Sequence, residues 1–241
     1  FLGLKGDPQY PPIVRAITAL GPAYIKFGQI LSTRPDVVGH ELAQQLRVLQ
    51  ESLPPFDRAI AIKEIEADLG QSVDTLFDDI SEPIAAASIA QVHQARLKST
   101  GQKVAIKVLR PGIEKAFRKD IDAFYFAAGM IERLSPRSRR LHPNEVIKHF
   151  DSIVRGELDL RLEASAASEF EANTADDALL SIPHVHWEYS GRKVMTLDWV
   201  DGIPLADVDA LRAAGTDMHE LATRILSMFL RHALRDGFFH G

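Results

Sequence analysis

Hydrophobic side chains recur every three or four positions along the first third of the chain, which is typical of helices that bury one face. Between residues 11 and 52 this spacing predicts two helices, opened by Pro12 and by Pro35. A third helix is expected over residues 56–70, where an aspartate stands at the capping position and a glycine at the end. We therefore expect residues 1–74 to form an N-terminal helical extension.

The pattern changes between residues 75 and 110, where the segments become short and richer in valine and isoleucine, as in strands. Ser-Thr-Gly at 99–101 predicts a hairpin turn between two of these strands. Helical spacing returns over residues 113–135 and 143–176.

The C-terminal part opens with "HVHWEYSGRKVMTLDWVDG", residues 184–202, which predicts two strands on either side of Ser190 and Gly191. A last helix is expected over about residues 216–236. The order is several helices, then a small antiparallel sheet with a helix inserted between its strands, then a helix. That order predicts an α+β fold.

Composition removes several classes of function. The net charge of −5 gives no electrostatic reason to expect a nucleic acid partner, and we expect none. The absence of cysteine excludes disulfides, thiolate metal sites and cysteine nucleophiles. No window is apolar over the eighteen or so residues that a membrane-spanning helix needs. The sequence begins without Met and stops directly after a helical pattern, so we expect it to be a piece of a longer protein.

One lysine stands among apolar residues. In "KVAIKVLR", residues 103–110, strand alternation places Lys107 between Ala105 and Leu109 on one face of the strand. An amine on a buried strand needs a carboxylate or phosphate partner, because desolvating it alone is costly. The alternative is a lysine on an edge strand whose amine reaches into water.

A run of small residues precedes this strand. "PIAAASIAQVHQ", residues 83–94, is either an alanine-rich helix or a hairpin with alanine where glycine is usual. A helix over 84–95 would run into the following strand with almost no room for a connection. In a hairpin, the small side chains of residues 85–88 would let a phosphate approach backbone N–H groups. A tight loop followed by a strand lysine is the arrangement of protein kinases, so we favour the hairpin.

An acidic segment later in the chain offers a partner for Lys107. In "GELDLRLEASAASEF", residues 156–170, the expected helix places Asp159 and Glu163 on one face and Glu157 about 120° away. One helix could then give Glu163 to Lys107 and leave the other two acids for a second cation. The alternative is an acidic face in water, the commonest fate of such a run.

Four short motifs resemble those of the ABC1/UbiB/ADCK family of atypical kinase-like proteins, in order and in spacing. They are "KFGQ" at 26–29, "AAASIAQVH" at 85–93, "VAIKV" at 104–108 and "ELDLRLEA" at 157–164. The resemblance implies a protein-kinase-like N-lobe over residues 75–200 with an inserted helix at about 113–135. Residues 201–241 would be the hinge and the first helix of the C-lobe.

The resemblance also implies roles for individual residues. Lys107 is similar to the lysine that binds nucleotide phosphates, and Glu163 to its ion-pair partner. Lys26 and Gln29 are similar to a lid motif that covers the place of a protein substrate. Glu157 and Asp159 resemble the acidic motif that would bind Lys26. Nucleotide contacts are expected from the alanine-rich loop and the hinge, at Ile84, Ala85, Ala86, Ala87, Ser88, Ile89, Ala90, Gln91, Val92, Trp199 and Val200.

For function, the resemblance implies an ATP- or ADP-binding protein of the kinase or ATPase type that supports ubiquinone biosynthesis. Its expected partners are a membrane lipid or quinone precursor and other ubiquinone-biosynthesis proteins, at the cytoplasmic face of the bacterial inner membrane. The Mg²⁺ ligands are expected beyond Gly241, so we expect residues 1–241 alone to be inactive. The alternative is a non-catalytic scaffold that uses the nucleotide only as a conformational ligand.

Overall fold

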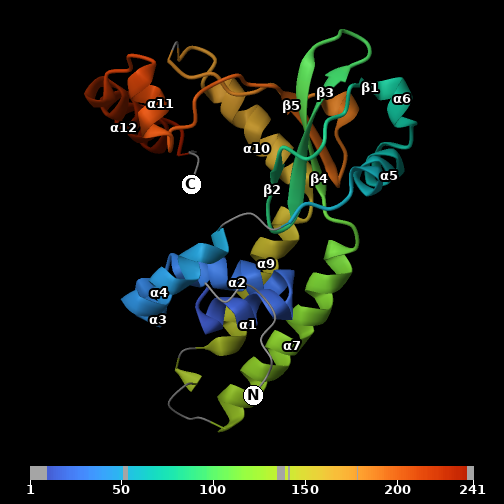
Figure 1. Ribbon diagram of the computed structural model, residues 1–241. Coiled ribbons are helices and arrows are strands. Elements are labelled where there is room, and N and C mark those ends of the chain that lie inside the picture. Colours follow the sequence, from blue (N-terminus) through green and yellow to red (C-terminus); the bar gives the residue numbers. More distant parts are fainter. Residues whose placement is uncertain (1–9, 51–53, 135–138, 141, 178, 238–241) are drawn as a thin grey trace.

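The computed structural model describes residues 10–50, 54–134, 139–140, 142–177 and 179–237 (Figure 1). The helices are α1 (Pro12–Leu20), α2 (Pro22–Ser32), α3 (Pro35–Val38), α4 (His40–Leu46), η1 (Arg47–Gln50), α5 (Arg58–Leu69), α6 (Val73–Leu76), α7 (Ile113–Leu134), α9 (Pro143–Glu157), α10 (Leu160–Asn173), η2 (Trp187–Tyr189), α11 (Val208–Ala213) and α12 (Met218–Arg235). The strands are β1 (Phe77–Asp78), β2 (Ala85–Ala86), β3 (Ala90–Leu97), β4 (Lys103–Leu109) and β5 (Val194–Asp198).

The strands form one antiparallel sheet in the order β1-β3-β4-β5, with β2 paired to the start of β3. β3 and β4 make the predicted hairpin around residues 99–101. The register places Lys107 between Val92 on β3 and Met195 on β5. A small sheet combined with many helices confirms the α+β fold that the sequence predicted.

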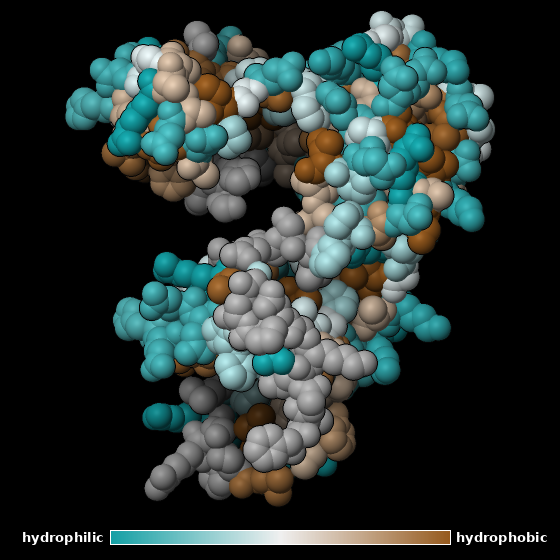
Figure 2. Space-filling view, in the orientation of Figure 1, coloured by the Kyte–Doolittle hydropathy of each residue, from teal (hydrophilic) through white to brown (hydrophobic). Residues whose placement is uncertain are grey.

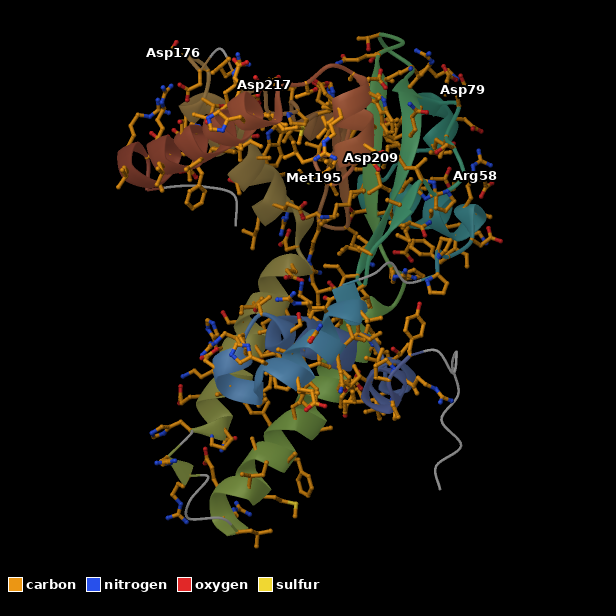
Figure 3. All side chains as sticks on the ribbon, turned by 60° about the vertical axis from the view of Figure 1, so that its left-hand side comes forward. Arg58, Asp79, Asp176, Met195, Asp209 and Asp217 are labelled. Atoms are coloured by element: carbon orange, nitrogen blue, oxygen red, sulfur yellow. The ribbon has the colours of Figure 1, made fainter. Side chains whose placement is uncertain are left out.

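Each face of the sheet has its own apolar core. The face that carries Val104, Ile106 and Val108 is fully buried against α5 and α6. The other face, which includes Leu109 and Met195, joins a core built from α2, α7, α9 and α10. Figure 3 shows the two sides: Arg58 of α5 lies on one side of the strands and Met195 on the other.

The third and inserted helices agree with the sequence analysis. The carboxylate of Asp57 accepts the N–H of Ala59 at the start of α5, and Gly70 ends that helix in the left-handed region at φ +68°. Glycine adopts this conformation without a steric penalty. α7 runs from Ile113 to Leu134 and packs along α9, away from the sheet (Figure 1).

The helices predicted between residues 11 and 52 are divided further than expected. Gly21, at φ +125°, separates α1 from α2, and Gly39, at φ +84°, separates α3 from α4. Residues other than glycine rarely adopt either of these backbone angles. The hydrophobic spacing runs through both glycines, so it did not reveal the turns.

The predicted helix over 143–176 was wrong in one respect, because it breaks between α9 and α10. Leu158 and Asp159 form the turn, and Asp159 takes an extended backbone at φ −126°. Its side chain accepts the N–H of Arg161 and so caps α10. A capped start satisfies a backbone donor that a continuous helix would have bonded internally.

The strand predicted before Ser190 was also wrong. Only Val185 makes a bridge, to Leu197, and Trp187–Tyr189 form a 3₁₀ turn. The hydroxyl of Ser190 donates to the carbonyl of His186 and accepts the N–H of Thr196. The hydroxyl therefore takes the place of one ladder hydrogen bond, from the N–H of Thr196 to the carbonyl of His186, while the N–H of His186 still donates to Thr196 and that of Asp198 to His184. β5, the strand predicted after the turn, is present.

The terminal helix α12 matches the expected range, and Asp217 caps its first turn. Side chains fasten it to the segment that follows α10. The carboxylate of Asp177 lies 2.8 Å from Arg231 and 3.2 Å from Arg235. Figure 2 shows an open hollow between the α11–α12 end of the molecule and the N-terminal helices, and the lower end of α10 lies at its right-hand edge in Figure 1. No helix in the described part of the chain is both long enough and apolar enough to cross a bilayer.

His93 makes the stability of the sheet depend on pH. Its ring is fully buried, lying 2.8 Å from the carbonyl of Ser81 and 2.9 Å from the side-chain amide of Gln91. Burial lowers the pKa of His93 below its ordinary 6.5. The neutral ring satisfies both contacts, so the contribution of His93 to stability is complete above pH 6.5 and is lost as the pH falls toward the folded-state pKa.

We therefore expect the urea midpoint of the wild-type chain to fall between pH 7.5 and pH 5.5, and to fall by less in His93→Gln. His219→Gln, at an exposed position on α12, is the control and should keep the wild-type dependence. Equal pH dependence in the wild type and His93→Gln would contradict this assignment.

Candidate nucleotide site

The predicted ion pair between the sheet and the acidic segment is present. Lys107 Nζ lies 2.6 Å from each carboxylate oxygen of Glu163, which stands in the first turn of α10. The pair joins the middle strand of the sheet to a helix 56 residues later in the chain. The fold therefore brings together the two residues that the sequence proposed as partners.

The pair is more exposed than the strand alternation suggested. The side chain of Lys107 keeps 27% of its accessible surface and that of Glu163 keeps 49%. An ion pair in contact with water contributes on the order of 1 kcal/mol or less to stability. The amine is thus held in a fixed place while remaining open to a further anionic group.

Packing of α10 on the sheet sets the geometry of this pair. Leu160 is fully buried, and its N–H donates to the carbonyl of Arg192, just before β5. Ala164, next to Glu163, is 1% exposed and belongs to the core shared with the sheet. A small side chain at this point allows the helix to approach the strands closely, so that Glu163 reaches Lys107.

The predicted site of Lys26 between Glu157 and Asp159 is present only in part. Lys26 Nζ lies 2.6 Å from Glu157, at the end of α9. Asp159 does not take part: its carboxylate binds Arg161 at 2.6 Å and lies 4.0 Å from Arg192. Hydrogen bonds from the Arg161 guanidinium hold the pKa of Asp159 below its usual value. The helix break at this residue turns it away from the direction that a continuous helix would give.

Aromatic rings fix the helix that carries Lys26. Phe27 lies 5.3 Å from Phe124 of α7 and 5.2 Å from Phe150 of α9, measured between ring centroids. Tyr24 meets Phe124 edge to face at 4.6 Å. These contacts anchor α2 across α7 and α9, so the Lys26–Glu157 pair lies at the border of an apolar contact.

The Gln29 and Gly28 positions of the predicted lid motif connect α2 to η1. The amide nitrogen of Gln29 donates to the carbonyl of Leu49 at 2.7 Å. A Cβ on Gly28 would come within 2.5 Å of the Leu49 side chain, so glycine permits the close approach. The side chain of Gln29 thus fastens α2 to η1, and its part in a lid over a protein substrate stays a prediction.

The alanine-rich segment is the hairpin that the sequence favoured. β2 pairs with the start of β3, and the N–H of Ala87 donates to the carbonyl of Ala90 across the turn. Val92 of the hairpin lies directly opposite Lys107 on β4. β3 therefore separates β2 from the strand of Lys107, and Ala85 of β2 pairs with the same Val92 that lies opposite the lysine.

Two of the residues expected to contact nucleotide, Gln91 and Trp199, have other partners, whereas the contact expected from Val200 stays a prediction. Gln91 is 1% exposed and points to the α5 face of the sheet, where it binds the backbone of Phe56. The backbone N–H of Trp199 donates to Lys103 and its indole to Asp201, so neither is free for a ligand. Val200 follows β5 with 62% of its surface exposed. The side chain of Gln91 cannot reach a ligand beside Lys107, because the sheet lies between them.

Comparison with known proteins fits this geometry. Residues 48–241 match the ABC1 atypical kinase-like domain. The chain belongs to the ABC1 atypical kinase-like family. It is also 45% identical over 226 residues to the probable protein kinase UbiB of Marinobacter nauticus. That alignment covers 93% of this chain but 41% of the relative, so the chain spans about two-fifths of the relative's length.

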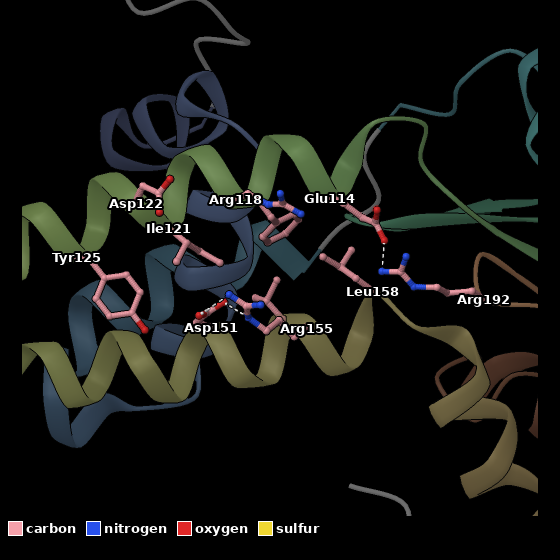
Figure 4. A pocket seen from close by; sticks show the side chains of 11 residues that line it. Glu114, Arg118, Ile121, Asp122, Tyr125, Asp151, Arg155, Leu158 and Arg192 are labelled. Carbon is pink, nitrogen blue, oxygen red and sulfur yellow. Dashed lines mark hydrogen bonds and ion pairs between the residues drawn. The ribbon is translucent and has the colours of Figure 1, made fainter.

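Within this ABC1 domain, a further cavity of about 300 Å³ lies between α7 and α9 (Figure 4). Its floor is apolar, and its rim carries guanidinium and carboxylate groups in equal number: Arg118, Arg155, Arg192, Glu114, Asp122 and Asp151. Neither Lys107 nor Glu163 lines it. Sequence reasoning missed this cavity, and the one signal for it was the spacing of four between Asp151 and Arg155, which form an ion pair.

No group of three or more His, Asp or Glu side chains in the described part of the chain comes together in a way that could hold a metal ion. Mg²⁺ binding through several carboxylates therefore has no counterpart among the described residues.

The corrected partner of Lys26 can be tested by double-mutant cycles. Lys26→Met combined with Glu157→Gln should show a coupling of about 0.5–1 kcal/mol in urea unfolding, because the two groups form a partly buried ion pair. The control cycle combines Lys26→Met with Asp159→Asn, which retains a capping side chain. We expect that cycle to be additive, and coupling equal to that with Glu157 would restore the two-acid site.

Proposed function

We propose that this ABC1-family protein binds ATP or ADP beside Lys107, and that the full-length protein is an atypical kinase or ATPase that supports ubiquinone biosynthesis. The observation that carries the proposal is the ion pair between Lys107 and Glu163, 2.6 Å long and open to solvent on one side. The name of the 45% identical relative, a probable protein kinase UbiB, supports the same class of activity.

The residues would act by holding and orienting the phosphates. The Lys107 amine already contacts both oxygens of Glu163, and it retains a third hydrogen for a phosphate oxygen. Ala85 at the hairpin has only a methyl group and is exposed, so a phosphate can come close to the backbone there. Mg²⁺ supplies charge neutralisation in phosphoryl transfer when it is bound.

The N-terminal helices favour a small or lipid-like acceptor over a peptide. α2 is fixed across α7 and α9 by aromatic contacts and by the Lys26–Glu157 pair. We therefore propose a membrane lipid or quinone precursor as the substrate class. The proposed site of action is the cytoplasmic face of a bacterial inner membrane, with other ubiquinone-biosynthesis proteins as partners.

Replacing the lysine tests the nucleotide site. In the 241-residue chain, Lys107→Met should weaken ADP and ATP binding by about 10- to 150-fold, because it removes a charge-assisted hydrogen bond to phosphate. Calorimetric titration with and without Mg²⁺ measures this. Lys103→Met, at the exposed start of the same strand, is the matched control and should bind as the wild type does.

In the full-length protein the same Lys107 variant should lose most of its nucleotide hydrolysis. Unchanged binding in the chain together with unchanged hydrolysis in the full-length variant would exclude Lys107 from the site.

A further inference from the structure

Residues 54–56, between η1 and α5, are bound to the strand that carries the alanine-rich turn. The buried side-chain amide of Gln91 accepts the N–H of Phe56 at 2.9 Å and donates to the carbonyl of the same residue at 3.2 Å. Both polar backbone groups of Phe56 are thus bonded to one side chain of β3. The third contact of this amide is His93, which in turn bonds Ser81.

Arg110 binds the same segment and the turn itself. Its backbone N–H donates to the carbonyl of Ile89 at 2.8 Å. Its guanidinium donates to the carbonyl of Ala87 at 3.0 and 3.1 Å and to that of Pro54 at 2.9 Å. The guanidinium also lies 5.7 Å from the centre of the Phe56 ring. One residue therefore connects the tip of the hairpin to the segment that leaves the N-terminal helices.

Side chains also tie η1, which precedes this segment in the chain, to α2. The carbonyl of Leu49, in η1, accepts the side-chain amide of Gln29, and Leu49 packs on Gly28. Side-chain contacts thus tie α2 to η1, and the covalent chain leads on from η1 to Pro54. From Pro54 and Phe56, contacts continue to Arg110, Gln91 and the alanine-rich turn.

We propose that Arg110 and Gln91 are positioning residues that set the conformation of the turn at Ala87–Ala90 and make it respond to the placement of α2. This rests on the proposed nucleotide site, because the turn is the part expected to contact phosphates. The planar guanidinium suits this role, since it reaches carbonyls of two separate segments at once. Its burial lowers the pKa of Arg110, in keeping with a cation held by carbonyl dipoles rather than by a carboxylate.

We call the hydrogen bonds by which Arg110 and Gln91 hold the turn at Ala87–Ala90 the clamp. Hydrogen exchange on the nucleotide-free chain tests it directly. Arg110→Lys keeps the charge but loses the fork, so the amides of residues 86–90 should exchange about tenfold faster than in the wild type. Arg58→Lys is the matched control, because Arg58 also donates to a carbonyl of this lobe, that of Ile80, at 2.9 Å. It should leave exchange at residues 86–90 unchanged. Equal exchange in Arg110→Lys and the wild type would overturn the clamp.

A double-mutant cycle tests the link to α2. Gln29→Ala and Arg110→Lys should each weaken ADP binding several-fold, and together they should weaken it at least threefold less than the product of the two single effects. A loss of stability alone would not produce this coupling in affinity, and Arg58→Lys combined with Gln29→Ala should be multiplicative. If the effects of Arg110→Lys and Gln29→Ala on ADP affinity simply multiplied, the proposed dependence of the turn on α2 would be overturned. If the wild-type chain bound no ADP, the proposed nucleotide site would fail, and the exchange comparison would still decide the clamp.

Discussion

Lys107 and Glu163 can meet only if a helix lies against the middle of the sheet at a fixed height and rotation. The ion pair does not supply that constraint, since both side chains remain partly in water. The apolar core between α10 and the sheet supplies that constraint. Leu160 and Ala164 of α10 pack with Leu109 and Met195 of the sheet, and each of these four is at most 1% exposed. Burial of apolar surface thus places the charges, and the charges then make this one region of the sheet chemically distinct.

The parts that the sequence predicted well are those fixed by neighbours along the chain. Alternation defined β4 and the face of Lys107, and a turn of small polar residues defined the β3–β4 hairpin. Asp57 and Gly70 marked the two ends of α5 because capping acts within one helical turn. Lys107 and Glu163 could be paired because Lys107 is a charge among apolar residues that needs a partner, and the acidic segment at 157–163 offered one.

The parts that it did not predict depend on contacts far apart in the chain. Hydrophobic spacing continues through Gly21 and Gly39, and only the packing of α1, α2 and α4 on one another shows why the chain turns there. Gln91 stands within an alanine-rich motif, yet its partner is the backbone of a residue 35 positions earlier. Asp68 of α5 likewise accepts N–H groups of Lys193 and Val194. No local pattern marks such bonds, because one partner is a backbone group that every residue possesses.

The turn at Leu158 and Asp159 has a consequence for how this region can change in evolution. Glu157 before it and Glu163 after it reach different lysines, on α2 and on β4. Only these two residues separate the helices, so inserting a single residue at this turn would change the position and orientation of one helix relative to the other. Both lysines could then no longer be neutralised at once. Deletions and insertions here should therefore be tolerated far less than substitutions of Leu158 by another apolar residue.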